Sequence, residues 1–81
     1  MQLDILTPEK KVYSGEADTV LLPGLHGKFE ILNRHAAMIS TLKEGTVKVK
    51  NGNEKLEFKI RAGIVEVLNN KISVLTEGII A

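Results

Sequence analysis

Two histidines are the residues of this chain best suited to bind a metal ion or to move a proton. His26 and His35 both lie in the segment PGLHGKFEILNRHA, at positions 23–36. Nine positions separate them, and neither an HExxH motif nor a cysteine stands nearby. Because structural zinc usually takes four protein ligands, the pair does not predict a metal site. We interpret His26 as a solvated loop residue and His35 as a surface or interface residue.

The stretch GLHGK, at 24–28, has the glycines and the lysine of a phosphate-binding loop but not their spacing. A Walker A motif places four residues between its glycines and a hydroxyl residue after its lysine. Here two residues separate Gly24 from Gly27, and Phe29 follows Lys28. No serine stands in a nucleophile elbow, and no paired carboxylates for acid–base work are evident. The sequence therefore predicts neither a catalytic site nor a cofactor.

The composition is that of one small domain. The chain has 81 residues and no cysteine, which excludes disulfides and thiolate metal clusters. Its 11 basic and 10 acidic residues leave a net charge of +1, which gives no electrostatic footprint for DNA or for an anionic membrane. The opening MQLDILTPEKK lacks the pattern of a signal peptide, and no apolar run approaches the ~18 residues of a membrane-spanning helix. We expect one domain that binds no nucleic acid and does not insert into a membrane.

Two β-hairpins are the clearest elements of the sequence. Residues 46–61 alternate apolar and charged side chains around an Asn-Gly pair at 51–52, which suits a tight turn. Residues 63–77 show the same alternation around an Asn-Asn pair at 69–70, which also suits a turn. In this second hairpin the opposite face is apolar as well, which predicts a strand covered on both sides. The residues of that opposite face are Ile64, Leu68 and Leu75.

The remaining segments are less regular. Short β-type runs at 3–6, 11–14 and 17–24 are bounded by prolines and glycines, and proline cannot donate a hydrogen bond to a strand ladder. Between residues 31 and 42, apolar residues recur at helical spacing, so this segment is compatible with a helix or with strands. These residues are Ile31, Leu32, Ala36, Ile39 and Leu42. Turn signals elsewhere favour an all-β sandwich or barrel.

The loop around Leu25 is the unusual feature of the chain. Gly24 and Gly27 let the backbone turn and approach another group closely. Leu25 is a large apolar residue at a position where a soluble loop favours polar ones. The loop is therefore either a plain structural turn or a contact surface held by a rigid scaffold.

Five features together resemble the β-sandwich domain of the ε subunit of F-type ATP synthases. They span nearly the whole chain in a consistent order, which makes the likeness more specific than any single motif. The features are the opening ILTPEKKVYSGEA, Pro23-Gly24 with Gly27, the pair His35-Ala36, LKEGTVKV at 42–49, and RAGIVEVLNNKISVLTE at 61–77.

The resemblance implies a ten-stranded, two-sheet β-sandwich, with strands in the middle segment. It also implies a non-catalytic subunit of the rotating central stalk, which docks the γ subunit onto the polar loops of the membrane c-ring and couples proton flow to ATP synthesis. Such a subunit is peripheral, on the cytoplasmic face of the bacterial cell membrane, and needs no cofactor.

The resemblance further assigns contact residues. Those expected to face the c-ring are Gly24, Leu25, His26, Gly27 and Lys28. Those expected to lie near γ are Ile31, His35, Ala36 and Met38. Many relatives continue into a two-helix C-terminal domain that can brake ATP hydrolysis, whereas residues 1–81 are expected to form a single sandwich without it. We therefore expect this chain to couple and stabilise the rotor without inhibiting it.

Two other classes of small β-domain compete with this interpretation. A biotinyl or lipoyl carrier needs a modifiable lysine at a hairpin tip, and Lys50 precedes the Asn-Gly turn without the usual flanking residues. An OB-type nucleic-acid binder needs exposed aromatics in a basic groove, and the three aromatics, Tyr13, Phe29 and Phe58, are dispersed. A mass spectrum of the native protein and a salt-dependent nucleic-acid binding assay distinguish these classes.

Overall fold

The computed structural model describes residues 1–80 and contains nine β-strands. No helix occurs in this part of the chain, and so none is long and apolar enough to cross a membrane. The strands are β1 (Gln2–Leu6), β2 (Lys11–Glu16), β3 (Thr19–Gly24), β4 (Gly27–Leu32), β5 (Met38–Leu42), β6 (Gly45–Asn51), β7 (Glu54–Ile60), β8 (Gly63–Leu68) and β9 (Lys71–Thr76).

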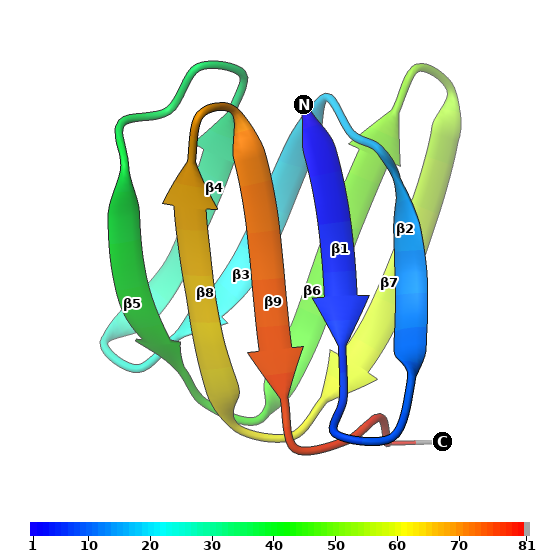
Figure 1. Ribbon diagram of the computed structural model, residues 1–81, viewed down its shortest axis with the longest axis vertical. Coiled ribbons are helices and arrows are strands. Elements are labelled where there is room, and N and C mark those ends of the chain that lie inside the picture. Colours follow the sequence, from blue (N-terminus) through cyan, green and yellow to red (C-terminus); the bar gives the residue numbers. More distant parts are fainter. Residues whose placement is uncertain (81) are drawn as a thin grey trace.

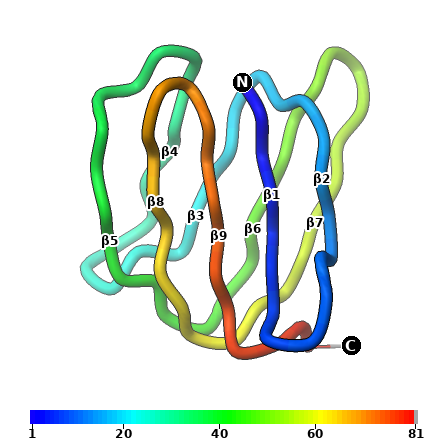
Figure 2. The backbone as a smooth tube through the Cα atoms, in the orientation of Figure 1, coloured from blue at the N-terminus to red at the C-terminus, as the bar shows by residue number. Residues whose placement is uncertain are grey.

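The strands form two stacked layers, which belong to one continuous, strongly curled sheet (Figure 1). One layer has the order β2-β1-β9-β8-β5, and the other has β4-β3-β6-β7. All pairs are antiparallel except β1 with β9, which run parallel. The layers connect at a single residue pair, in which Gly24 of β3 faces Leu42 of β5. The chain trace in Figure 2 shows that the β3–β4 turn and the β6–β7 turn lie at opposite ends of the sandwich.

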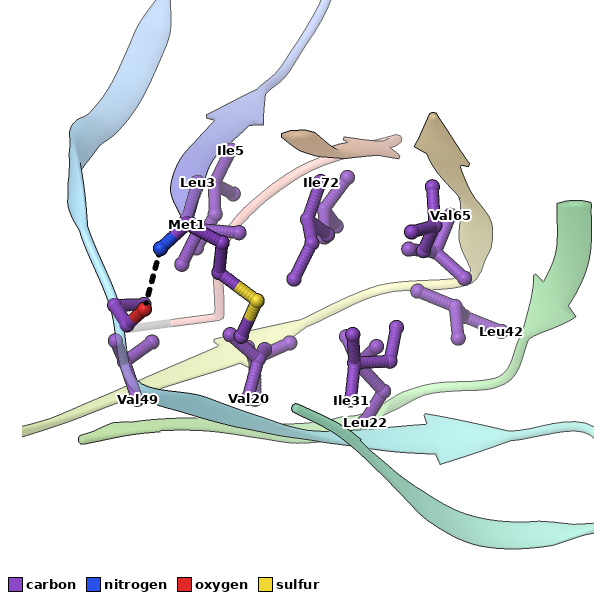
Figure 3. Close-up of a cluster of buried hydrophobic side chains, with 14 of the residues drawn as sticks. Met1, Leu3, Ile5, Val20, Leu22, Ile31, Leu42, Val49, Val65 and Ile72 are labelled. Atoms are coloured by element: carbon purple, nitrogen blue, oxygen red, sulfur yellow. Dashed lines mark hydrogen bonds between the residues drawn. The ribbon is translucent and has the colours of Figure 1, made fainter. Parts of the chain in front are cut away.

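The core consists of aliphatic side chains that alternate along each strand and meet between the layers (Figure 3). Side chains of successive strand residues point to opposite faces, and so Leu3 and Ile5 of β1 point inward together with Ile72 and Val74 of β9. The facing layer contributes Val20, Leu22, Ile31, Val47, Val49 and Ile60. At the open edge, Tyr13 of β2 packs on Phe58 of β7 with ring centroids 5.4 Å apart.

The all-β prediction is confirmed, and the middle segment forms the strands β4 and β5 rather than a helix. The strand count is nine among residues 1–80, whereas ten were expected. The isolated bridge between Ile60 and Ile79 extends the pairing near the C-terminal end without forming another strand. The apolar residues between 31 and 42 have helical spacing, but they do not form a helix, because a loop at 33–37 separates the two strands.

Both predicted hairpins form, and one turn is centred one residue later than its sequence suggests. Asn69 and Asn70 both have positive φ, of 51° and 60°, as a type I′ turn requires. In the other hairpin Asn51 still pairs with Glu54, so the turn is centred on Gly52 and Asn53. Gly52 adopts a φ of 61° there, the positive value that a type II′ turn needs at its first central residue.

Replacing Ile72 by Ala tests the packing of the core. Ile72 is fully buried, and deleting its side-chain carbons leaves a cavity, so we expect the free energy of unfolding to fall by about 2–4 kcal/mol. Urea denaturation measures the loss. The control is Ile64→Ala on the neighbouring strand, at a side chain that is 41% exposed, and it should cost about 1 kcal/mol or less. Equal losses for the two variants would contradict the assigned strand faces.

Candidate functional site

The turn between β3 and β4, residues 24–27, forms a two-residue hairpin that we call the tip. Gly24 faces Gly27 across the hairpin, and Leu25 and His26 form the turn. A Cβ atom on Gly24 would lie 2.5 Å from the Gly27 carbonyl oxygen and 2.8 Å from the Phe29 ring. Gly27 has a φ of 134°, which L-residues rarely adopt. Both positions therefore require glycine for the backbone to turn so closely.

Backbone hydrogen bonds to the neighbouring layer hold the tip in place. The Leu25 N–H donates to the Thr41 carbonyl oxygen at 3.1 Å, and the Lys43 N–H donates to the Pro23 carbonyl oxygen at 2.9 Å. The Leu25 side chain is nevertheless 52% exposed. It borders an open hollow whose walls include His26, Phe29 and Ile39. The tip thus presents an apolar side chain to solvent from a fixed backbone.

The outer surface of β5, β8 and β9 carries a group of exposed aliphatic side chains that we call the apolar face. Its members are Ile39, Ile64, Leu68 and Leu75, which are 70%, 41%, 52% and 43% exposed. Ile64 pairs directly with Leu75 on β9 and with Thr41 on β5. Ile39 also borders the hollow beside Leu25, so the apolar face and the tip adjoin. A sheet surface that exposes several large aliphatic side chains is typical of a protein contact site.

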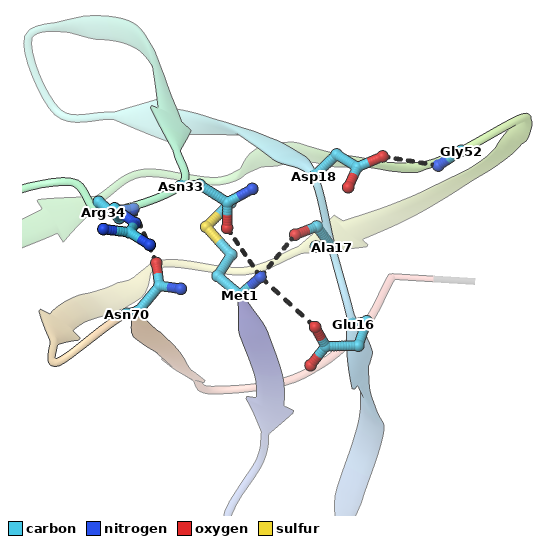
Figure 4. A network of polar contacts seen from close by, with 8 residues as sticks. All are labelled: Met1, Glu16, Ala17, Asp18, Asn33, Arg34, Gly52 and Asn70. Carbon is cyan, nitrogen blue, oxygen red and sulfur yellow. Dashed lines mark hydrogen bonds and ion pairs between the residues drawn. The ribbon is translucent and has the colours of Figure 1, made fainter.

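Polar contacts fix the end of the sandwich opposite the tip (Figure 4). The Arg34 N–H donates to the Asn70 side-chain oxygen at 2.8 Å, which ties the 33–37 loop to the β8–β9 turn. The Met1 amino group donates to the Asn33 side-chain oxygen at 2.9 Å and to the Ala17 carbonyl at 3.1 Å. His35 is exposed on this loop and shares a hollow with Leu68. The loop therefore continues the apolar face at its far end.

Six of the nine residues predicted as contacts are exposed, one is half-buried and two are buried. Leu25, His26, Gly27, Lys28, His35 and Ala36 are exposed, whereas Gly24 is buried at the base of the tip. Met38 is half-buried and packs against the core. The assignment of Ile31 as a contact is wrong, because its side chain points between the layers and is fully buried. Its exposed neighbour on β4 is Leu32, which is 52% exposed.

The two histidines lie at opposite ends of β4 (Gly27–Leu32). A strand of this length spans roughly 20 Å, so His26 and His35 do not converge on one ligand. Within residues 1–80, no group of three or more metal-binding side chains comes together.

The sequence predicts a covering layer over Ile64, Leu68 and Leu75, but in the structure these side chains are exposed. Both faces of the second hairpin are apolar, but only the face that carries Val65 and Val67 meets the opposite layer. Apolar residues on both faces of a strand indicate that each face packs against other protein surface. They do not indicate whether the surface that covers the second face comes from the same chain or from a partner.

The carboxyl group of Asp4 belongs to a polar cluster on β1 and β2, beside the apolar face. Hydrogen bonds from the Ser14 hydroxyl, at 2.7 Å, and from the Gln2 amide, at 3.0 Å, lower the pKa of Asp4. The nearby Lys71 ammonium, 3.5 Å away, acts in the same direction. Asp4 is only 8% exposed. Its partners stabilise the charged form, so the cluster serves to hold β1, β2 and β9 together.

Comparison with protein families gives one match over the whole chain. The model for the β-sandwich domain of the ATP synthase delta/epsilon chain matches residues 1–81. The chain belongs to this family. Its two layers are therefore those of an ATP synthase delta/epsilon sandwich domain.

Several relatives of the family are named ATP synthase epsilon chain. The Desulforamulus reducens relative is 42% identical over 76 residues, which cover 94% of this chain and 58% of that protein. The Helicobacter pylori P12 relative is 36% identical over 78 residues, covering 96% and 63%. The Chlorobium limicola relative is 40% identical over 79 residues, covering 96% and 90%. The chain thus spans about three fifths of the first two relatives and nine tenths of the third.

Solved structures share the fold at low sequence identity. A chain in the central stalk and c-ring structure of the Tetrahymena thermophila mitochondrial ATP synthase matches with a TM-score of 0.83 and 17% identity, covering 98% of this chain and 64% of that one. A chain in the Euglena gracilis mitochondrial ATP synthase, in a structure of OSCP, F1 and c-ring, matches with a TM-score of 0.89 and 16% identity, covering 96% and 51%. At these identities the likeness establishes the sandwich fold.

Removing the Ser14 hydroxyl tests the role of the Asp4 cluster. Because the folded-state pKa of Asp4 is lowered, its charged form stabilises the fold above its unfolded pKa, and this contribution is lost as pH falls through the folded pKa. Ser14→Ala should therefore lower the free energy of unfolding at pH 7 by about 1–2 kcal/mol. The difference from the wild type should vanish in acid, at a pH below both pKa values.

Chemical denaturation at several pH values measures this difference. The control is Ser73→Ala on β9, opposite Asp4 in the ladder, which donates no hydrogen bond to that carboxylate among residues 1–80. A Ser14→Ala deficit that stayed constant from neutral pH to strong acid would show that the hydroxyl does not act through the Asp4 charge.

Proposed function

We propose that this chain is a non-catalytic epsilon-type subunit of an F-type ATP synthase. In this role it rotates with the central stalk, joins the γ subunit to the c-ring, and helps to couple proton flow to ATP synthesis. It is peripheral, and it is held at the cytoplasmic face of a bacterial membrane by its partners. The observation that carries the proposal is the match of residues 1–81 to the family of ATP synthase delta/epsilon sandwich domains.

The tip is the surface proposed to meet the c-ring. Leu25 and His26 project from the end of the sandwich, and Gly24, Gly27 and Lys28 complete the turn and its flank. A contact that transmits torque must be rigid. Two backbone hydrogen bonds hold this turn against β5 and the residue that follows β5. An exposed leucine on a fixed turn can fill an apolar pocket with little loss of conformational entropy on binding.

The apolar face is the surface proposed to meet the γ subunit. Stable subunit interfaces have an apolar centre and a polar rim. The exposed aliphatic side chains of β5, β8 and β9 supply such a centre, and Glu66 and Thr41 lie among them. His35 lies beside Leu68 at the end of this face, and the exposed Ala36 next to it would extend the contact. Met38, also predicted to lie near γ, packs against the core instead. The tip and the apolar face adjoin at Ile39, so one rigid domain can bridge two partners.

Replacing Leu25 by Asp, alone or together with His26→Asp, tests the proposed ring contact. A buried carboxylate without a partner is costly, so we expect the variant subunit to be released from membranes at least tenfold more readily. Immunoblots of washed membranes measure the attachment. Proton pumping and ATP synthesis in membrane vesicles measure the coupling, and both should fall.

The matched control for the ring contact is Leu32→Asp. Leu32 lies at the opposite end of β4 and is 52% exposed, like Leu25. Its substitution should leave unchanged both coupling and the attachment that survives a high-salt wash. Membranes that carry the Leu25→Asp and His26→Asp changes and yet pump and synthesise normally would overturn the assignment of the tip.

Replacing Ile64 by Asp tests the proposed γ contact separately. Ile64 lies in the middle of the apolar face, and central apolar residues dominate the binding energy of interfaces. We expect the affinity for the purified soluble part of the complex that contains γ to fall by about 10- to 100-fold. Co-sedimentation or fluorescence titration measures it. Leu25→Asp should leave this affinity unchanged, and equal losses for both variants would contradict two separate surfaces.

A further inference from the structure

The outer surface of the second layer carries a concentration of lysines that we call the cationic face. It is formed by the outward positions of β4, β6 and β7, all of which lie on the side away from the core. Its exposed cations are Lys28, Lys48, Lys50, Lys55 and Lys59. Its exposed acids are Glu30 and Glu57. Five positive and two negative charges give this face a net charge of +3.

The remainder of the chain is acidic by comparison. Of 11 basic and 10 acidic residues, 6 basic and 8 acidic residues lie outside the cationic face, for a net charge of −2. The total of +1 therefore hides a separation of charge across the sandwich. A net charge near zero does not prevent a protein from presenting a local field of one sign.

None of the lysines of this face takes part in an ion pair among residues 1–80, although Lys48 faces Glu57 directly across the β6–β7 ladder. The two ion pairs among residues 1–80 join Met1 to Glu16 and Lys71 to Asp4, on the other layer. Lys50 and Lys55 pair directly across the β6–β7 ladder, an arrangement that is destabilising for like charges. Asp18, at the same end of the sandwich, accepts a hydrogen bond from the Gly52 N–H at 2.7 Å (Figure 4). The stability of the fold therefore does not account for Lys50 and Lys55 facing each other.

We propose that the cationic face adsorbs to the anionic headgroups of a lipid bilayer. The face is a pleated sheet surface whose projecting groups are mainly ammonium groups, which matches an anionic phosphate surface in charge. A protein partner would call for an apolar centre, and Leu32 is the only exposed large aliphatic residue on this face among residues 1–80. A nucleic acid would call for exposed aromatics on which bases stack, whereas Phe29 and Phe58 point inward against the core.

This adsorption goes beyond the proposed role in the central stalk and does not depend on it. The apolar face lies on the other layer and remains free when the cationic face is engaged, whereas the tip adjoins the cationic face through Lys28. Adsorption would concentrate the unassembled domain at the membrane, where its proposed ring partner resides. It involves no insertion, because the charged side chains stay at the headgroup level.

Sedimentation with vesicles that contain no protein tests the proposal. The probe is a vesicle of phosphatidylcholine with about one third phosphatidylglycerol, compared with pure phosphatidylcholine at about 25 mM and about 250 mM salt. A local charge of +3 should enrich the domain roughly 100-fold at the anionic surface at low salt. The enrichment should disappear in high salt and on neutral vesicles.

A pair of matched double variants identifies the face responsible. Lys50→Gln with Lys55→Gln should reduce the enrichment by roughly 20-fold. Lys10→Gln with Lys11→Gln removes the same net charge from exposed positions at the β1–β2 turn and should change it less than about twofold. All four lysines are exposed, and thermal unfolding verifies that both variants fold.

Three outcomes would overturn the proposal. The first is a lack of binding to the anionic vesicles at low salt. The second is an equal loss for both double variants, which would indicate a response to net charge alone. The third is binding of a single-stranded oligonucleotide that depends on Lys50 and Lys55 while vesicle binding is absent. Because the vesicles contain neither c-ring nor γ subunit, each result is independent of the proposed stalk function.

Discussion

The structure depends on the junction at which one curled sheet passes from its first layer to its second. A single residue pair, Gly24 with Leu42, makes this connection between β3 and β5. The same Gly24 begins the tip, and its missing side chain leaves room for the Gly27 carbonyl and the Phe29 ring. Gly24 therefore has two roles: it joins the two layers, and it begins the turn that exposes Leu25. A rigid tip is a consequence of how the sandwich closes.

The two outer surfaces of the sandwich differ in chemistry because the outward-facing positions of the two layers hold different types of residue. On β8 and β9 these positions hold Ile64, Leu68 and Leu75 among a few polar residues. On β6 and β7 they hold mainly lysines. Apolar surface is stabilised by exclusion of water against a closely fitting partner, whereas ammonium groups remain hydrated and act at longer range. The two faces therefore suit a tight protein contact and a weak, salt-sensitive attraction.

Local sequence patterns predicted most of the fold. Alternation along residues 46–61 and 63–77 indicated both hairpins, and the Asn-Asn pair at 69–70 marked a turn that forms as predicted. The prominence of Leu25 between two glycines also pointed to the tip. The errors have two causes. Burial of Ile31 and exposure of Ile64 depend on how distant strands stack, which a local pattern does not specify. The shift of the 51–52 turn by one residue comes from the register of the neighbouring strands β6 and β7.

The sequence by itself determined that this chain is an all-β domain with tight turns, since alternation and turn chemistry act between near neighbours. It also determined the glycine-bounded turn that carries Leu25. Only the tertiary structure decided which apolar side chains are left uncovered and how charges are grouped. Lysines from β4, β6 and β7 combine on one face because the ladder brings together residues up to 31 positions apart, from Lys28 to Lys59. The composition gives the number of charged residues, whereas strand pairing and register determine on which face of the sandwich each one lies.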